Sequence, residues 1–147
     1  MKIAIGNDHA AVEMKQEIIK YLEGKGHEMV DCGTYTTESC DYPIYGKKVA
    51  VAVRDHEVDC GILICGTGIG ISLAANKVKG IRCAVCSEPV SARLTKEHNN
   101  ANIIAFGARI VGLEMAKAIV DAWLDARYLG TERHEKRVQM IADIENE

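Results

Sequence analysis

The sequence lacks an excess of positive charge and lacks any long apolar run. Its 147 residues carry a formal net charge of −3. Phosphate backbones are bound by basic faces, so this charge gives no electrostatic support for a nucleic-acid partner. No apolar run reaches the roughly 20 residues that cross a bilayer, and the N-terminus enters a strand-like segment at once. We therefore expect a cytoplasmic protein with neither a membrane span nor a signal peptide.

The six cysteines do not form a disulfide or metal pattern. In a short secreted chain an even count suggests a disulfide framework, but several of these cysteines lie inside apolar runs, where a free thiol behaves as a small hydrophobe. Cys83 and Cys86 form a C-x-x-C, yet they fall in a predicted strand, which points residues three apart to opposite faces. No second cysteine–histidine pair has zinc spacing. We expect reduced thiols and no metal site.

Strand-like and helix-like segments alternate along the chain. The predicted strands cover residues 2–6, 28–32, 60–65, 81–86 and 102–106. The predicted helices cover residues 10–23, 44 to about 54, 71–77, 87–97, 113–127 and about 132–147. The strand Cys60–Cys65 is apolar throughout, as expected of a central parallel strand that is covered on both faces. This pattern predicts an α/β fold: a Rossmann-like three-layer sandwich with a five-stranded parallel sheet and helices on both faces, in one domain over residues 1–147.

The strongest local signal is the segment Cys65-Gly66-Thr67-Gly68-Ile69-Gly70, which follows the central strand and opens a helix. In such sheets ligands bind beyond the carboxyl ends of the strands, and amides at a helix start favour negative charge. A cysteine at this place is favoured as the thiolate. Taken alone, the segment is equally consistent with a tight turn around a buried cysteine.

Two other types of site can be compared with the spacing. A dinucleotide fingerprint needs G-x-G-x-x-G, and here the third glycine comes one residue early. Glu88 lies about where the ribose-binding acid would stand, so this alternative is weakened but stays open. A cysteine-dependent phosphatase needs an arginine six residues after its nucleophile to clamp the phosphoryl oxygens, and that position is Ile71. The phosphatase interpretation is excluded.

Further polar residues stand where the predicted elements end. Asp8 and His9 follow the first strand, although Asp8 is also suited to cap the next helix. His98 ends a helix, where a histidine is often a simple dipole contact. Arg133 and Arg137 are four residues apart on one helix face, which suits either a phosphate dianion or a solvated face paired with Glu132 and Glu135. Arg109 follows the last strand and adds a cation.

Together these segments resemble type B ribose-5-phosphate isomerases, a family shared with the subunits of galactose-6-phosphate isomerase. The resemblance spans the full length. It is carried by Ile5-Gly-Asn-Asp-His9, Asp41-Tyr42-Pro43, Ile64-Cys-Gly-Thr-Gly-Ile-Gly-Ile71, Ala74-Ala-Asn-Lys77, Gly80-Ile-Arg82, Glu97-His-Asn99, Ala101-Asn102, Gly107-Ala-Arg109 and Arg133-His-Glu-Lys-Arg137. Some members use a glutamate that would fall at position 71, whereas this chain matches the branch with a cysteine base.

The resemblance implies an activity in the pentose phosphate pathway, the interconversion of D-ribose 5-phosphate and D-ribulose 5-phosphate through an enediolate. It implies that Cys65 is the base, that His98 assists ring opening and that Thr67 handles the hydroxyl proton. The implied substrate-binding residues are Asp8, His9, Tyr42, Gly66, Gly68, Ile69, Gly70, Asn99, Arg109, Arg133 and Arg137, with the three arginines on the phosphate.

The same resemblance implies no metal or organic cofactor, and a homodimer or dimer of dimers with sites at the subunit interface. We expect His98, Asn99 and Arg109 to serve the Cys65 of a partner. Two alternatives remain open. The substrate can be a six-carbon sugar phosphate or a free rare sugar, such as allose 6-phosphate or galactose 6-phosphate. The second alternative is a non-catalytic module that binds a sugar phosphate or nucleotide on the same fold, because fold alone does not fix function.

Overall fold

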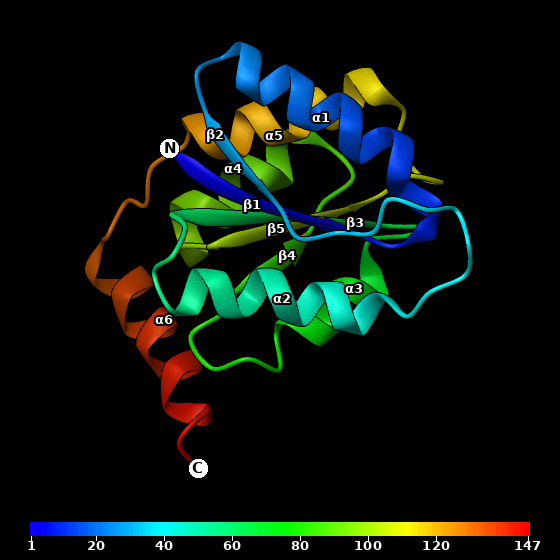
Figure 1. Ribbon diagram of the computed structural model, residues 1–147. Coiled ribbons are helices and arrows are strands. Elements are labelled where there is room, and N and C mark those ends of the chain that lie inside the picture. Colours follow the sequence, from blue (N-terminus) through cyan, green and yellow to red (C-terminus); the bar gives the residue numbers. More distant parts are fainter.

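Five parallel strands form the centre of the molecule in the order β2-β1-β3-β5-β4 (Figure 1). The structure is a computed structural model that describes residues 1–147. The strands are β1 (Lys2–Asn7), β2 (Glu28–Asp31), β3 (Cys60–Cys65), β4 (Cys83–Val85) and β5 (Ile103–Gly107). The strand order reverses at β1, because β2 pairs with one side of it and β3 with the other. In open α/β sheets such a reversal marks the place where ligands bind.

Helices cover both faces of this sheet. They are η1 (His9–Ala11, a 3-10 turn), α1 (Val12–Gly24), α2 (Tyr42–Arg54), α3 (Ile69–Ala75), α4 (Pro89–Asn99), α5 (Leu113–Asp125) and α6 (Glu132–Ile144). Helices α1, α4 and α5 pack on one face, and α2 and α3 on the other (Figure 1). The predicted three-layer fold and its five parallel strands are confirmed. No helix combines the length and the apolar character that a membrane crossing requires.

The alternation of side chains along the strands divides the core into two halves. On β3, Ile62 and Ile64 pack with α1, α4 and α5, whereas Leu63 and Cys65 pack with α2 and α3. The thiol of Cys65 therefore points to the face on which α3 begins. Cys83 and Cys86 also fall on opposite faces of the sheet, as the strand period predicts.

Each connecting helix returns from the carboxyl edge of the sheet to its amino edge. Helix α4 begins just after β4 and ends just before β5, so its last turn lies at the amino edge. Helix α6 starts at that edge too, because the Leu129 amide, just ahead of it, donates to the Glu97 carbonyl at 3.0 Å. In Figure 1 α6 lies on the side where the N-terminus and the start of β1 are found. The end of α4 and the start of α6 therefore lie close together at the amino edge.

Candidate functional site

Cys65 ends the central strand, and its thiol lies where the glycine loop begins. The residue is 4% exposed, and the Gly68 amide donates a hydrogen bond to its Sγ at 3.1 Å. The Cys65 sulfur therefore has a backbone N–H donor directly beside it. By contrast, burial raises the pKa of Cys60 to about 11, of Cys83 to about 12 and of Cys86 to about 11. Those three thiols stay protonated at neutral pH and cannot act as bases.

The loop after Cys65 presents backbone N–H groups to one place. The amides of Gly66, Thr67 and Gly70 donate to no acceptor within the chain. The Ile69 amide donates to the hydroxyl of Thr67 at 3.2 Å, and the Gly68 amide is directed at Cys65. Three free amides beside a cysteine sulfur suit an oxyanion that forms next to it. The amides of Gly68 and Ile69 are used instead in hydrogen bonds to side chains of the site, Cys65 and Thr67.

Two positions of this loop require glycine, because a side chain there would collide with neighbouring atoms. Gly68 has a φ of 79°, and a Cβ there would lie 2.7 Å from the backbone carbon of Phe106. A Cβ on Gly70 would lie 2.5 Å from Cζ of Tyr42. The Tyr42 ring therefore lies directly against the glycine loop, although Tyr42 comes from the start of α2.

Asp8 and His9 follow β1, the strand next to β3, and so lie beside the glycine loop. The Asp8 amide donates to the Ile64 carbonyl at 3.3 Å. Oδ1 of Asp8 accepts from the Ala10 amide at 3.0 Å, so the carboxylate caps η1, as one sequence interpretation held. His9 is half-buried, and its Nδ1 accepts the N–H of Cys40 at 3.2 Å. The structure thus brings together Cys65, the glycine loop, Tyr42, Asp8 and His9.

Arg109 joins this group from the turn after β5. Its amide donates to the Gly66 carbonyl at 3.0 Å, and a Cβ on Gly66 would lie 3.3 Å from Nη1 of Arg109. The guanidinium therefore lies against the glycine loop of its own chain. The expectation that Arg109 serves the Cys65 of a partner is not supported.

The remaining predicted residues form a second group at the amino edge of the sheet. His98 and Asn99 end α4, and Arg133 and Arg137 lie in α6. The His98 ring stacks on His134, with centroids 4.6 Å apart and planes inclined by 12°. Burial lowers the pKa of His134, and the nearby charges of His98 and the two arginines lower it further.

Both arginines of this second group are exposed, and neither forms an ion pair within the chain. The alternative of a helix face paired with Glu132 and Glu135 is therefore not what the structure contains. Two unpaired guanidinium groups beside two imidazoles form a strong anion-binding surface.

Within one chain, the group around Cys65 and the group around His98 lie far apart. In the β3–β5 ladder Gly61 pairs with Ile103 and Cys65 with Gly107, so four residue steps, about 13 Å, separate the amino edge from the carboxyl edge. Hydrogen-bonded catalysis needs heavy atoms within about 3 Å of one another. Within a single chain Cys65 and His98 therefore lie at opposite edges of the sheet.

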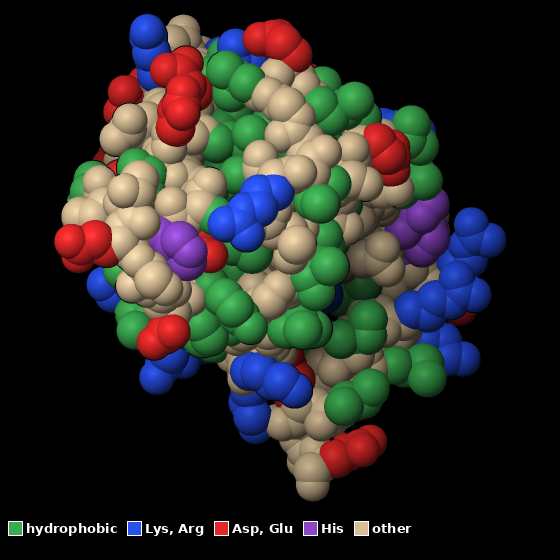
Figure 2. All heavy atoms as spheres, turned by 90° about the vertical axis from the view of Figure 1, so that its right-hand side faces the viewer, with side chains coloured by type: hydrophobic (Ala, Val, Ile, Leu, Met, Phe, Trp, Pro, Cys, Tyr) green, Lys and Arg blue, Asp and Glu red, His purple; other side chains and the backbone are tan.

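The carboxyl edge has the character of an interaction surface. Figure 2 views the molecule from the right-hand side of Figure 1, towards which the strands run. Hydrophobic side chains, together with backbone and uncharged polar side chains, fill much of the centre of this face, and most charged side chains lie around its margins. Exposed apolar residues that the topology places here include Tyr42, Ile69, Val90 and Ile110. Large exposed apolar areas commonly mark places where another protein binds.

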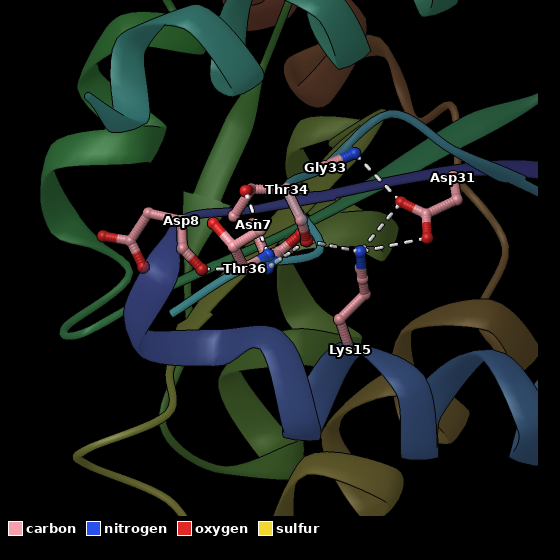
Figure 3. A network of polar contacts seen from close by, with 7 residues as sticks. All are labelled: Asn7, Asp8, Lys15, Asp31, Gly33, Thr34 and Thr36. Carbon is pink, nitrogen blue, oxygen red and sulfur yellow. Dashed lines mark hydrogen bonds and ion pairs between the residues drawn. The ribbon is translucent and has the colours of Figure 1, made fainter. Parts of the chain in front are cut away.

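The sequence analysis missed a buried polar network beside Asp8, which links Asn7, Lys15, Asp31 and Thr34 (Figure 3). A signal was present. Ala11, Lys15, Ile18 and Leu22 are spaced as one helix face, and all four are buried. A lysine on the apolar face of a helix should have been read as a buried charge with a partner. His134 was also missed, and no pattern in the sequence singles it out.

Comparisons with known proteins identify the family of this chain. The family model described as Ribose/Galactose Isomerase matches residues 3–141. Ribose-5-phosphate isomerase B of Escherichia coli (strain K12) is 57% identical over 98% of this chain and 96% of its own length. Galactose-6-phosphate isomerase subunit LacB of Clostridium acetobutylicum is 45% identical over 100% of this chain and 86% of its own. The solved structure of ribose-5-phosphate isomerase B from Clostridium thermocellum superposes with a TM-score of 0.97 at 54% identity, over 99% and 98% of the two chains.

Proposed function

This chain belongs to the ribose/galactose isomerase family, and we propose that it is an aldose–ketose isomerase that interconverts D-ribose 5-phosphate and D-ribulose 5-phosphate. The observation that carries this proposal is the position of Cys65. Its sulfur accepts an N–H at 3.1 Å and stands beside three free amides at the point where the strand order reverses. A proton acceptor next to an oxyanion cradle is what an enediolate reaction requires.

In the proposed reaction the Cys65 thiolate removes the proton from C2 of the open-chain aldose. The electron pair of that C–H bond forms the C1–C2 double bond, and negative charge develops on the carbonyl oxygen. Amides of the glycine loop stabilise this oxygen, and the Thr67 hydroxyl relays a proton between the two oxygens. The Cys65 thiol then returns its proton to C1, which gives the ketose. Because one group serves as base and then as acid, no net proton is lost.

We propose that two copies of the chain complete each site. Asp8, His9, Tyr42, Arg109 and the glycine loop of one subunit would face the partner subunit's His98, Asn99, Arg133 and Arg137. The separation of the two groups within one chain and the apolar carboxyl edge support this arrangement. In it the partner subunit's His98 opens the furanose ring and the arginines hold the phosphate. A homodimer is the smallest assembly that does this, and dimers can pair further.

We also propose that residues 1–147 act as one domain in the cytoplasm and that the reaction uses no metal ion or organic cofactor. The general base, the oxyanion donors and the cationic phosphate site are all supplied by side chains and amides of this chain. An aldose–ketose exchange needs no electron acceptor, because the substrate and the product have the same oxidation level.

The test is to incubate the purified, chelator-treated protein with ribose 5-phosphate and to follow ribulose 5-phosphate. Allose 6-phosphate and galactose 6-phosphate are assayed in parallel. Rapid turnover of the pentose supports the proposal. Turnover of a hexose only would keep the chemistry and change the substrate, and no turnover of any of the three would favour a non-catalytic binding module.

A six-carbon substrate is the second candidate. The family model covers both ribose and galactose isomerases, and the galactose-6-phosphate isomerase subunit matches the whole chain at 45% identity. The comparison of kcat/KM for five-carbon and six-carbon sugar phosphates decides between the two candidates, because an extra carbon must be fitted between Cys65 and the same phosphate site.

Arg133→Ala is expected to raise the KM for ribose 5-phosphate about tenfold or more, because charge-assisted hydrogen bonds to phosphate are lost. The phosphate does not react, so kcat is expected to change less than KM. Lys136→Ala removes a neighbouring cation of the same helix and is the matched control, with a KM within about twofold of wild type. An unchanged KM in Arg133→Ala would show that α6 does not bind the phosphate.

A further inference from the structure

Lys15 is an unusual residue in this protein because its charged side chain is completely buried. It is 0% exposed on the apolar side of α1. Its Nζ lies 3.1 Å from Oδ1 and 3.0 Å from Oδ2 of Asp31, and it donates to the Thr34 carbonyl at 2.8 Å (Figure 3). The Tyr35 ring lies 4.2 Å from the ammonium group. A buried charge is costly unless it is fully paired, so this arrangement is specific.

The Thr34 carbonyl links Lys15 to the end of β1, because Asn7 of β1 binds the same carbonyl. Nδ2 of Asn7 donates to the same carbonyl at 3.3 Å and to the carbonyl of Asp8 at 2.8 Å. Asn7 is also 0% exposed, and Gly33 packs so closely on it that a Cβ would collide with its Oδ1. Through this shared carbonyl, Lys15 holds residues 33 and 34, which follow β2, against the end of β1 beside Asp8.

That segment has few other attachments. Residues 33–40 take part in no backbone–backbone hydrogen bond, and the stretch from Tyr35 to Ser39 is exposed. At one end it is joined to the rest of the chain by the Gly33 amide on Asp31, the Thr34 carbonyl and the Tyr35 ring on Lys15. At the other end it is joined by the Cys40 amide on His9. Immediately beyond it Tyr42 covers the glycine loop. The segment held at Thr34 is thus linked to Asp8 through Asn7 and contacts His9 through Cys40.

The contact at Cys40 has a consequence for His9. Because Nδ1 of His9 accepts the Cys40 N–H, a neutral His9 must carry its proton on Nε2. The Nε2–H is then a hydrogen-bond donor for a phosphate or hydroxyl oxygen of the sugar. If residues 33–40 shift, this preference for one tautomer is lost.

We propose that Lys15 is a positioning residue for the reaction: it clamps the Thr34 carbonyl and so fixes the segment 33–40, which in turn holds His9 in its Nε2–H tautomer beside Asp8. This inference rests on the proposed function, because it concerns the binding of the sugar phosphate by Asp8 and His9. It goes beyond that function by assigning a role to a buried residue that does not touch the substrate.

The test compares three variants. Lys15→Met removes the ammonium group but keeps the length of the side chain. The double variant Lys15→Met/Asp31→Asn also removes the unpaired carboxylate, while the asparagine oxygen can still accept the Gly33 amide. Lys25→Met is the matched control, since Lys25 lies at the end of the same helix and pairs with Asp121 at 2.6 Å, away from the segment 33–40.

We expect Lys15→Met to lower both the thermal midpoint and kcat/KM. In the double variant the midpoint should recover most of its loss, because no buried charge is left unpaired. Its kcat/KM should stay about 10- to 100-fold below wild type, mainly through KM, because the substrate-binding groups are displaced. Lys25→Met should keep kcat/KM within about twofold. Recovery of both the midpoint and kcat/KM in the double variant would overturn the proposal and leave Lys15 with a purely structural role.

The tautomer of His9 gives a second readout that does not depend on turnover. In wild type the imidazole ¹⁵N shifts of His9, assigned by their loss in His9→Gln, should report a protonated Nε2 and an unprotonated Nδ1. An Nδ1–H tautomer in wild type, or unchanged shifts in a folded Lys15→Met, would contradict the proposal. A wild-type protein that turns over no sugar phosphate would overturn the proposed function, whereas the His9 shifts would still test the tether.

Discussion

Cys65→Ala is expected to reduce kcat for ribose 5-phosphate by about 10²- to 10⁴-fold or more, while the dissociation constant for the sugar phosphate stays close to that of wild type. The alanine removes the group that we propose takes the C2 proton, and the residue is nearly buried, so little surface changes. The groups proposed to hold the phosphate remain in place. Turnover and calorimetric binding measured on the same preparation separate these two effects.

Exchange of the C2 hydrogen gives a sharper test of the base. Wild-type protein in D₂O should introduce deuterium at C2 of ribose 5-phosphate, and Cys65→Ala should not. Thiol alkylation is best performed in a Cys40→Ser background, because Cys40 is half-buried and its sulfur lies 3.8 Å from Nδ1 of His9. Residual exchange at the wild-type rate in Cys65→Ala would show that another residue is the base.

Mixing two inactive variants should restore activity. Cys65→Ala and His98→Ala each lack one half of the site, and a shared site regains both halves when the subunits combine. Equal amounts that exchange at random give half heterodimers, each with one intact site of two. The expected recovery is therefore about a quarter of the wild-type activity. The effect is large, because the starting level is close to zero.

The mixture is made by joint refolding or by prolonged incubation at low concentration, and activity is followed over time. Cys65→Ala mixed with Cys65→Ala/His98→Ala is the control, because no combination of those subunits contains a thiol at position 65. If a mixture whose subunits demonstrably exchange stays inactive, the two groups do not serve one site. The separation of Cys65 from His98 within one chain would then need another explanation.

A site divided between subunits also explains why both groups look incomplete alone. The carboxyl edge holds the Cys65 thiol, free amides and the exposed Arg109. The amino edge holds stacked imidazoles and two arginines without acidic partners. The first suits an enediolate and the second suits a phosphate, so one sugar phosphate lying between two subunits would use both.

The sequence by itself determined the fold and the nature of the chemistry. Local periodicity is set by neighbours in the chain, so the apolar run Cys60–Cys65 and the stripes of the helices were sufficient to predict five parallel strands and their covering helices. The glycine spacing after Cys65 was likewise a local property. The helix boundaries differ from the predicted ones by a few residues, since α3 ends at Ala75 and a 3-10 turn precedes α1.

Only the tertiary structure decided which side chains meet. Arg109 was expected to serve a partner, but the turn after β5 folds it over its own Gly66. The apolar helix face marks Lys15 as buried, but only the packing of α1 against β1 shows that its partners are Asp31 and Thr34. His98 and Cys65 are part of the same predicted chemistry, yet they lie at opposite edges of the sheet. The physical reason is shared by all three: strand direction and helix packing bring together residues far apart in the chain, and no local pattern records those distances.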